Sequence, residues 1–87
     1  MNRNDTVREV TERLSIAEVI GEYVSLKRSG SNFLGLCPFH GEKTPSFNVN
    51  PAREIFHCLG CGAGGDIFSF VIKIEGISFP EALHKLA

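Results

Sequence analysis

The chain has 87 residues, a formal net charge of −1 and 43% hydrophobic residues. This length accommodates one small domain, residues 1–87, whose apolar core alone would be only marginally stable. The apolar content excludes a simple disordered segment, and the apolar runs are too short to cross a bilayer. We therefore expect a single domain without membrane association, stabilised by an additional element such as a metal ion.

The number of cysteines argues against a disulfide-based fold. There are three, an odd number, and the charged residues within 1–14 exclude a secretory signal peptide. We therefore expect reduced thiols in a cytoplasmic protein, available to bind a metal.

The first quarter of the chain predicts two short helices. Asp5 is expected to cap the first helix. Ser15 and Glu18 form a capping-box pattern for the second helix, which Gly21 would end. The apolar residues of the two helices are Val7, Val10, Leu14, Ile16, Val19 and Ile20.

The middle of the chain predicts an antiparallel sheet, because short alternating segments are separated by turn residues. The expected strands are 23–28, 32–36, 46–49 and 54–57, with turns at 29–31 and 50–53. One face should pack against the flanking helices, and its expected members are Val24, Leu26, Phe47, Val49 and Ile55. The expected members of the opposite, exposed face are Tyr23, Ser25, Lys27, Ser46, Asn48 and Phe56.

Two helices are expected to close the chain. Asp66 would cap the first helix and Gly76 would end it, while Ser78 and Glu81 form a capping box for the second, with Pro80 in its first turn. The expected buried residues are Ile67, Phe68, Phe70, Val71, Ile74, Phe79, Leu83 and Leu86. No cap follows the final helix, so we expect the chain to be a fragment of a longer protein.

The strongest functional signal is the pattern Cys37-x2-His40-x17-Cys58-x2-Cys61. Two ligand pairs with two-residue gaps, separated by fifteen to twenty residues, are typical of a zinc ribbon. Four ligands complete a tetrahedron and leave no position for water or substrate, so the site is structural rather than catalytic. The predicted fold is thus a small α+β zinc ribbon, an antiparallel sheet flanked by short helices, with one structural Zn²⁺.

Three other chemistries compete with zinc binding. Cys58 and Cys61 could form a redox pair, although the usual βαβ context is missing. An iron–sulfur cluster would require four thiolates, and a nucleophilic cysteine would require an oriented triad. His57 competes with His40 for the fourth ligand position, but adjacent side chains on a strand face opposite ways, so His57 should point away from the metal.

The run from Gly21 to Leu86 resembles the N-terminal zinc-binding domain of bacterial DnaG-type DNA primases. The matching stretches are GEYVSLKRSGSNF, GLCPFHGEKTPSFNVNP, EIFHCLGCGAGGDIFSF and EGISFPEALHKLA. The ligands of the family fall on Cys37, His40, Cys58 and Cys61, whereas Leu59 occupies a position where many members have an aromatic residue.

This resemblance implies that the parent protein is a nucleotidyltransferase that makes RNA primers on single-stranded DNA in the bacterial cytoplasm. Its polymerase domain, of the TOPRIM type, and its helicase-binding domain are both absent from this chain. The expected partners are the DNA template, the RNA primer, the polymerase domain of the same or a neighbouring primase, and the replicative helicase through the absent domain. The chain alone should be non-catalytic, since its only two aspartates have the positions of helix caps.

The expected DNA-binding surface lies in residues 27–57, where four basic and two acidic residues give a net charge of +2. Basic groups hold phosphates and exposed aromatic rings stack on bases. The candidate contacts are Lys27, Arg28, Asn32, Lys43, Ser46, Asn48, Arg53 and Phe56. Phe56 could instead support the zinc site. Two alternative functions remain open, a protein-interaction module and a thiol-redox sensor.

Overall fold

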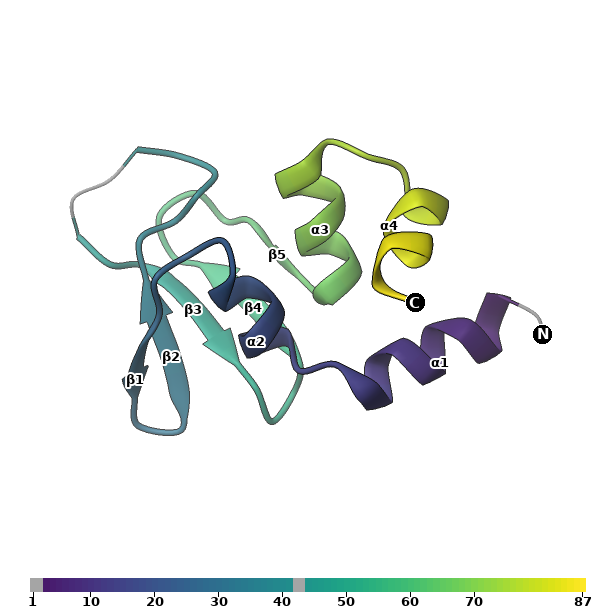
Figure 1. Ribbon diagram of the computed structural model, residues 1–87. Coiled ribbons are helices and arrows are strands. Elements are labelled where there is room, and N and C mark those ends of the chain that lie inside the picture. Colours follow the sequence, from purple (N-terminus) through teal and green to yellow (C-terminus); the bar gives the residue numbers. More distant parts are fainter. Residues whose placement is uncertain (1–2, 42–43) are drawn as a thin grey trace.

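The computed structural model describes residues 3–41 and 44–87, which form one five-stranded sheet and four helices (Figure 1). The strands run antiparallel in the order β1-β2-β3-β4-β5. Within the described ranges, no helix is both long and apolar enough to cross a membrane. The elements are α1 (Arg3–Arg13), α2 (Ile16–Gly21), β1 (Lys27–Ser29), β2 (Asn32–Gly35), β3 (Phe47–Asn50), β4 (Ile55–Cys58), β5 (Gly64–Gly65), α3 (Ile67–Glu75) and α4 (Phe79–Leu86).

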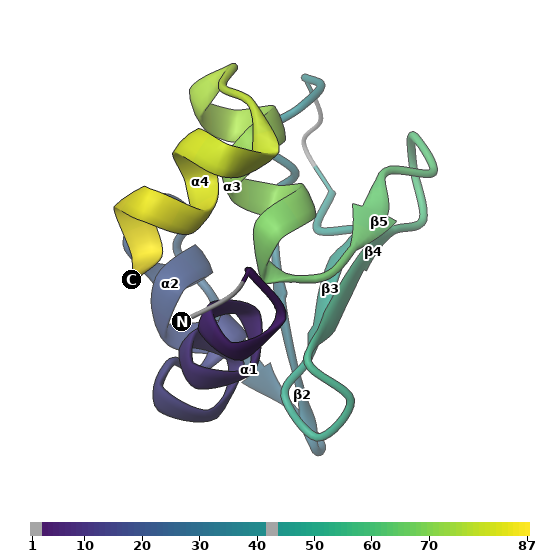
Figure 2. The same cartoon turned by 90° about the vertical axis from the view of Figure 1, so that its right-hand side faces the viewer.

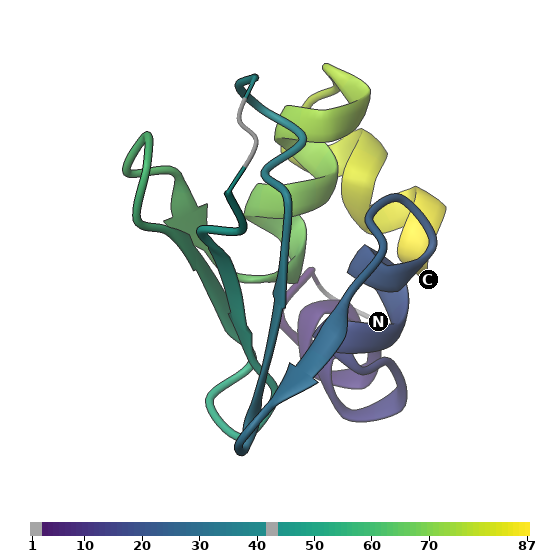
Figure 3. The ribbon, with the colours of Figure 1, turned by 90° about the vertical axis from the view of Figure 1, so that its left-hand side faces the viewer.

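The four helices lie on one side of the sheet, as Figures 2 and 3 show from opposite directions. We call the helix-covered side the inner face and the other side the outer face. An antiparallel sheet can be solvated on one face, which requires that its strands alternate between buried and exposed residues. β3 and β4 follow this pattern, because Phe47, Val49, Phe56 and Cys58 are buried and alternate with more exposed residues.

Aromatic side chains form the centre of the core between the sheet and α3. The Phe47 and Phe56 rings are stacked with centroids 5.3 Å apart, and Phe70 of α3 meets the Phe56 ring edge-on at 5.6 Å. Phe39, from the loop after β2, lies 5.7 Å from the Phe70 ring centre. Each such pair stabilises the fold beyond its area of contact, by about 0.5–1.5 kcal/mol.

The predicted faces of β4 are wrong. Phe56 was expected on the exposed face and Ile55 on the buried face, yet Phe56 is only 2% exposed and Ile55 is half-buried. The register explains the difference, because Phe56 pairs with the buried Val49, and Cys58 pairs with the buried Phe47. Paired residues share a face of the sheet, so both Phe56 and Cys58 must point inward.

The ends of the last two helices agree with the sequence. Asp66 accepts a hydrogen bond from the Ser69 N–H at 2.9 Å, and Gly76 ends α3 in the left-handed conformation at φ 66°. The Ser78 hydroxyl accepts from the Glu81 N–H at 3.3 Å. The buried stripe of α4 differs, since Ala82 is its fully buried residue. Its expected core residues Phe79, Leu83 and Leu86 are only half-buried.

The start of the second helix is capped from another part of the chain. Ser15 has the extended backbone of an N-cap residue but makes no side-chain cap bond, so the expected capping box with Glu18 does not form. Instead, the Glu54 carboxylate accepts a hydrogen bond from the Ile16 N–H at 2.9 Å. Glu54 adopts φ 54°, which is unusual for a residue with a side chain. The turn between β3 and β4 thus anchors α2.

Other element boundaries also differ from expectation. The first helix begins at Arg3, which places Asp5 in its first turn rather than at the cap. The expected strand 23–28 is reduced to Lys27–Ser29, because the N–H groups of Tyr23 and Val24 both donate to the Ile20 carbonyl in a turn that follows α2. The two-residue strand β5 was not expected, since Gly64 and Gly65 carry no strand signal.

Candidate metal centre

The four predicted ligands come together at one end of the sheet. Cys37 and His40 lie in the loop that follows β2, Cys58 is the last residue of β4, and Cys61 lies in the next turn. Their ligand atoms all lie within 4.8 Å of one another. The Sγ atoms of Cys37 and Cys61 are 3.8 Å apart, and Cys58 Sγ is 3.9 Å from His40 Nδ1. The antiparallel β3–β4 pair thus brings together two half-sites that are distant in sequence.

These distances fit a tetrahedral zinc ion. Zinc–sulfur bonds of about 2.3 Å at tetrahedral angles place two sulfur atoms ~3.8 Å apart, and a sulfur and a nitrogen ligand ~3.6 Å apart. The observed separations agree with both values to within a few tenths of an ångström. Three thiolates and one imidazole complete the coordination of zinc, so the site has no open position for catalysis.

Hydrogen-bond donors surround the ligand sulfurs and favour their thiolate form. The Phe39 N–H donates to Cys37 Sγ at 3.4 Å, and the Ser46 hydroxyl lies 3.5 Å from Cys58 Sγ. Burial opposes ionisation of Cys58, but the Ser46 hydroxyl and the N–H groups of the following turn outweigh it and lower the Cys58 pKa to about 6. Burial raises the pKa of the Cys37 thiol. The charge of a zinc ion would favour both thiolates.

The second zinc turn contains a glycine that makes room for the histidine ligand. A Cβ at Gly60 would lie 2.8 Å from His40 Nε2 and 3.1 Å from Ser46 Oγ. The imidazole therefore packs directly against the backbone of Gly60, with Nε2 towards the glycine and Nδ1 near the thiols. The close approach explains the need for glycine at this position.

The choice between the two histidines is settled by the sheet. His57 is exposed and pairs with Asn48 on the outer face, whereas the ligands gather at the end of the inner face. His57 is not part of the ligand cluster, and His40 is. The alternation along β4 thus separates the two side chains as expected.

The whole described chain matches one protein family. The family model described as "CHC2 zinc finger", which represents the zinc ribbon of DnaG, matches residues 2–87. The chain belongs to the CHC2 zinc-finger family of DnaG-type primases. This CHC2 domain holds one structural Zn²⁺ through Cys37, His40, Cys58 and Cys61, as the converging ligand atoms and the family agree.

Individual relatives support the same assignment. The CHC2 domain is 59% identical over 83 residues to the DNA primase of Geobacillus stearothermophilus and 53% identical over 83 residues to that of Thermotoga maritima. In both cases 95% of this chain is covered, but only 14% and 15% of the relatives. Among solved structures, this chain matches part of the crystal structure that contains the zinc-binding and RNA polymerase domains of the Aquifex aeolicus primase. The TM-score is 0.89 and the identity 46%, over 94% of this chain and 20% of that one.

The residues expected to contact DNA are spread over different parts of the CHC2 domain. Lys27, Asn32 and Asn48 lie on the outer face, and Arg53 is exposed in the turn after β3. Arg28 faces the other side of the sheet, with its guanidinium carbon 5.9 Å from the Phe33 ring centre. Two other candidates have structural surroundings instead, because Ser46 contacts the metal ligand Cys58 and Phe56 is buried in the core. Lys43 lies outside the described residues.

Two outer-face residues escaped the sequence analysis. His57 was considered only as a competing metal ligand, yet it is exposed on the same face as Asn48. Leu59 was noted only as a departure from the family, yet its side chain is 73% exposed. The expected orientation of His57, away from the metal, already implies that it lies on the outer face with Asn48.

Proposed function

We propose that this chain recognises the template for a DNA primase, binding single-stranded DNA and so assisting RNA primer synthesis in the bacterial cytoplasm. The observation that carries this proposal is the outer face. A row of paired residues, Lys27, Leu34, Asn48 and His57, crosses four strands on the side that no helix covers. Such a face offers a cation for phosphate and hydrogen-bonding groups for bases, the two needs of template binding.

Few cations contribute to this surface, so binding by the isolated chain should be weak. Among the described residues, Lys27 is exposed on this face and Arg53 is exposed in the turn after β3, and residues 27–57 carry a net charge of only +2. With at most about three or four phosphate contacts on a single strand, the logarithm of affinity should fall with the logarithm of salt concentration with a slope of roughly −2 to −3. Tethering to a polymerase domain would compensate by raising the effective concentration.

Charge-matched lysine variants test the proposal. Lys27→Ala should weaken binding of a fluorescent single-stranded oligonucleotide and reduce the salt slope by about one contact. Lys85→Ala removes the same charge from α4, on the opposite side of the sheet, and should leave affinity nearly unchanged. Equal losses in the two variants would mean that only net charge matters and that the outer face is not the binding surface.

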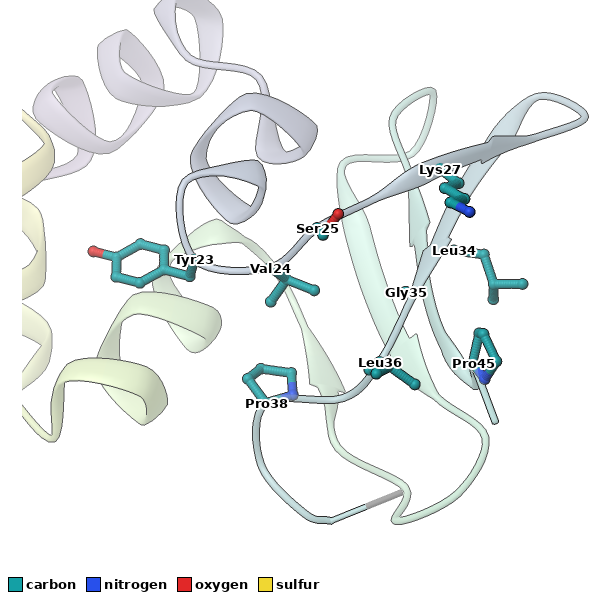
Figure 4. Close-up of a pocket in the computed structure, with 9 residues that line it drawn as sticks. All are labelled: Tyr23, Val24, Ser25, Lys27, Leu34, Gly35, Leu36, Pro38 and Pro45. Atoms are coloured by element: carbon teal, nitrogen blue, oxygen red, sulfur yellow. The ribbon is translucent and has the colours of Figure 1, made fainter. Parts of the chain in front are cut away.

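A groove that shares Lys27 and Leu34 with the outer-face row suits a protein partner. An apolar groove of about 520 Å³ lies beside the first zinc half-site, and Leu36, which is 49% exposed, lies within it (Figure 4). The solved Aquifex aeolicus primase carries an RNA polymerase domain on the same chain as its zinc-binding domain. We propose that the groove contacts the polymerase domain of the same or a neighbouring primase. Its lining residues are Tyr23, Val24, Ser25, Lys27, Leu34, Gly35, Leu36, Pro38 and Pro45.

A substitution at Leu36, which lines the groove but is not part of the outer-face row, separates the two roles. Leu36→Asn in the full-length primase should reduce primer synthesis while zinc content and single-stranded DNA binding by the CHC2 domain stay unchanged. A loss of DNA binding equal to the loss of primer synthesis would assign the groove to the template instead. This domain would also help to engage the RNA primer, whereas contact with the replicative helicase would involve the further domain that the resemblance implies.

A further inference from the structure

The outer face contains a small hollow whose lining is rich in amide groups. It has a volume of about 200 Å³ and lies over β2, β3 and β4. Three asparagines and one histidine contribute to it, together with apolar residues, and among residues 3–41 and 44–87 none that lines it is a lysine, arginine, aspartate or glutamate. We call it the amide hollow, and its lining residues are Asn32, Asn48, Asn50, Ile55, Phe56, His57 and Leu59.

The strand register brings the polar groups of the hollow together. Asn48 and His57 are direct partners across β3 and β4, so their side chains stand about 5 Å apart on one face. Asn50 follows two residues after Asn48 and therefore shares its face. The Asn50 Oδ1 accepts from the Arg53 N–H at 3.1 Å, which fixes the carboxamide and turns its NH₂ group away from that bond.

One neighbour of His57 on the outer face has no side chain. Gly64 pairs with His57 on β5, and a Cβ there would lie 3.3 Å from His57 Cδ2 and 3.0 Å from the Phe56 carbonyl oxygen. Any larger residue would crowd the imidazole. Leu59, which is 73% exposed and also lines the hollow, offers an apolar surface to a bound ligand. Gly64 thus lets the His57 ring lie against the backbone of β5, with an apolar neighbour nearby.

This chemistry suits a nucleobase better than a phosphate. Base edges carry neighbouring donors and acceptors, which carboxamide and imidazole groups match, whereas phosphates need cations. The cation lies next to the hollow rather than within it, because Lys27 is on the same row of paired residues, two strands from Asn48. A strand whose phosphate contacts Lys27 would bring a neighbouring base towards the hollow.

We propose that the amide hollow accepts one unpaired template base and reads its edge through Asn48 and His57. This inference rests on the proposed function, since it names the subsite through which the outer face would distinguish template sequences. Lys27 then provides affinity that is independent of sequence, and the hollow provides the sequence preference. The two contributions can be measured separately because different residues supply them.

The test uses the zinc-loaded 87-residue chain and five short DNA strands. Four strands carry a single A, C, G or T at one position among abasic nucleotides, and the fifth is wholly abasic, so that all five present the same phosphates. We expect one base to bind about fivefold or more tightly than the abasic strand. In an NMR titration, that base should shift the side-chain NH₂ signals of Asn32, Asn48 and Asn50.

The variants separate base reading from phosphate binding. Asn48→Ala and His57→Ala should each bring the preferred strand down to the affinity of the abasic strand, whereas Lys27→Ala should weaken all five strands by a similar factor. Zinc content and circular dichroism confirm that each variant is folded. Ser31→Ala, in the exposed turn between β1 and β2, is the control and should change nothing.

Different failures point to different conclusions. A base preference that persists in Asn48→Ala and His57→Ala overturns the inference but leaves the proposed function intact. Equal losses for base-bearing and abasic strands overturn it too, since the hollow would then hold only the backbone. Unchanged DNA binding with reduced primer synthesis by the full-length variants would assign the hollow to a protein contact. If the wild-type chain binds no strand at low salt, including one of mixed natural sequence, the proposed function itself fails.

Discussion

Replacing Gly60 with alanine tests how the histidine ligand is held. The added Cβ would lie 2.8 Å from His40 Nε2 and 3.0 Å from His40 Cε1. Favourable contacts between such atoms occur at about 3.5–4.0 Å, so the imidazole must move by several tenths of an ångström or more. Because the ring is packed against the turn, this movement shifts Nδ1 relative to the three sulfurs.

The size of the effect follows from the role of the ring as a ligand. Disturbing the groups that orient a metal ligand typically costs 10–100-fold in metal affinity, which corresponds to about 1.4–2.7 kcal/mol. A structural zinc site contributes roughly 10–16 kcal/mol of apparent binding free energy. Gly60→Ala should therefore still fold with zinc but should bind the metal 10–100-fold more weakly.

Competition with a chromophoric chelator measures this affinity, and two other glycines provide controls. Gly41→Ala meets no atom of residues 3–41 or 44–87 within 4 Å and should bind zinc like the wild type. Gly62 has φ 80° and open space, so Gly62→Ala should lower stability by about 1–2 kcal/mol through backbone strain alone, with unchanged His40 imidazole signals. If Gly60→Ala binds zinc as tightly as Gly41→Ala, the packing of the imidazole against the turn does not hold the ligand in place.

Three further perturbations test the rest of the scaffold. His40→Ala should weaken zinc binding and His57→Ala should not, as X-ray absorption and chelator competition can show; the reverse result would make His57 the ligand. Removal of zinc by a chelator should abolish the cooperative thermal transition of the strand region, and an unchanged melting curve after verified zinc loss would contradict this. Glu54→Ala should destabilise the zinc-loaded chain by about 0.5–2 kcal/mol in urea, whereas Glu54→Gln keeps an acceptor for the Ile16 N–H and should lose less. Equal losses would assign the effect to the negative charge of Glu54 near the start of α2.

The parts of the fold that the sequence predicts best are those set by local interactions. The Asp66 and Ser78 caps each bond an N–H three residues later, and Gly76 supplies the left-handed conformation that ends α3. The ligand set is equally local, because each two-residue gap defines its own turn. Such features are encoded within a few residues, so a pattern of residue types is enough to find them.

The features that could not be predicted from the sequence depend on contacts between residues far apart in the chain. Ser15 and Glu18 match a capping box, but the acceptor for α2 comes from Glu54, which is 38 residues away from Ile16. No local pattern reveals such a bond. β5 likewise consists of two glycines without strand propensity and exists because β4 offers it an edge to pair with.

The wrongly predicted face of β4 shows that a metal ligand fixes the orientation of its neighbours along the strand. Alternation alone allows either face to be the buried one, and the apolar side chain of Ile55 favours the wrong choice. The metal ligand decides it, because Cys58 must face inward and Phe56, two residues earlier, must follow. The alternation that places His57 away from the metal, extended by one residue, also places Phe56 in the core.

The same constraint explains where a functional surface can exist on this domain. The zinc site is closed, so it supplies structure and no chemistry. The inner face is occupied by the aromatic cluster and the four helices, which leaves the outer face as the broad surface of the sheet that can meet a partner. Its geometry is fixed from both ends of β4, by the zinc at Cys58 and by the hydrogen bond of Glu54 to α2. Because β4 is fixed at both ends, its side chains lose little further conformational entropy on binding. A few uncharged contacts can therefore distinguish one base from another.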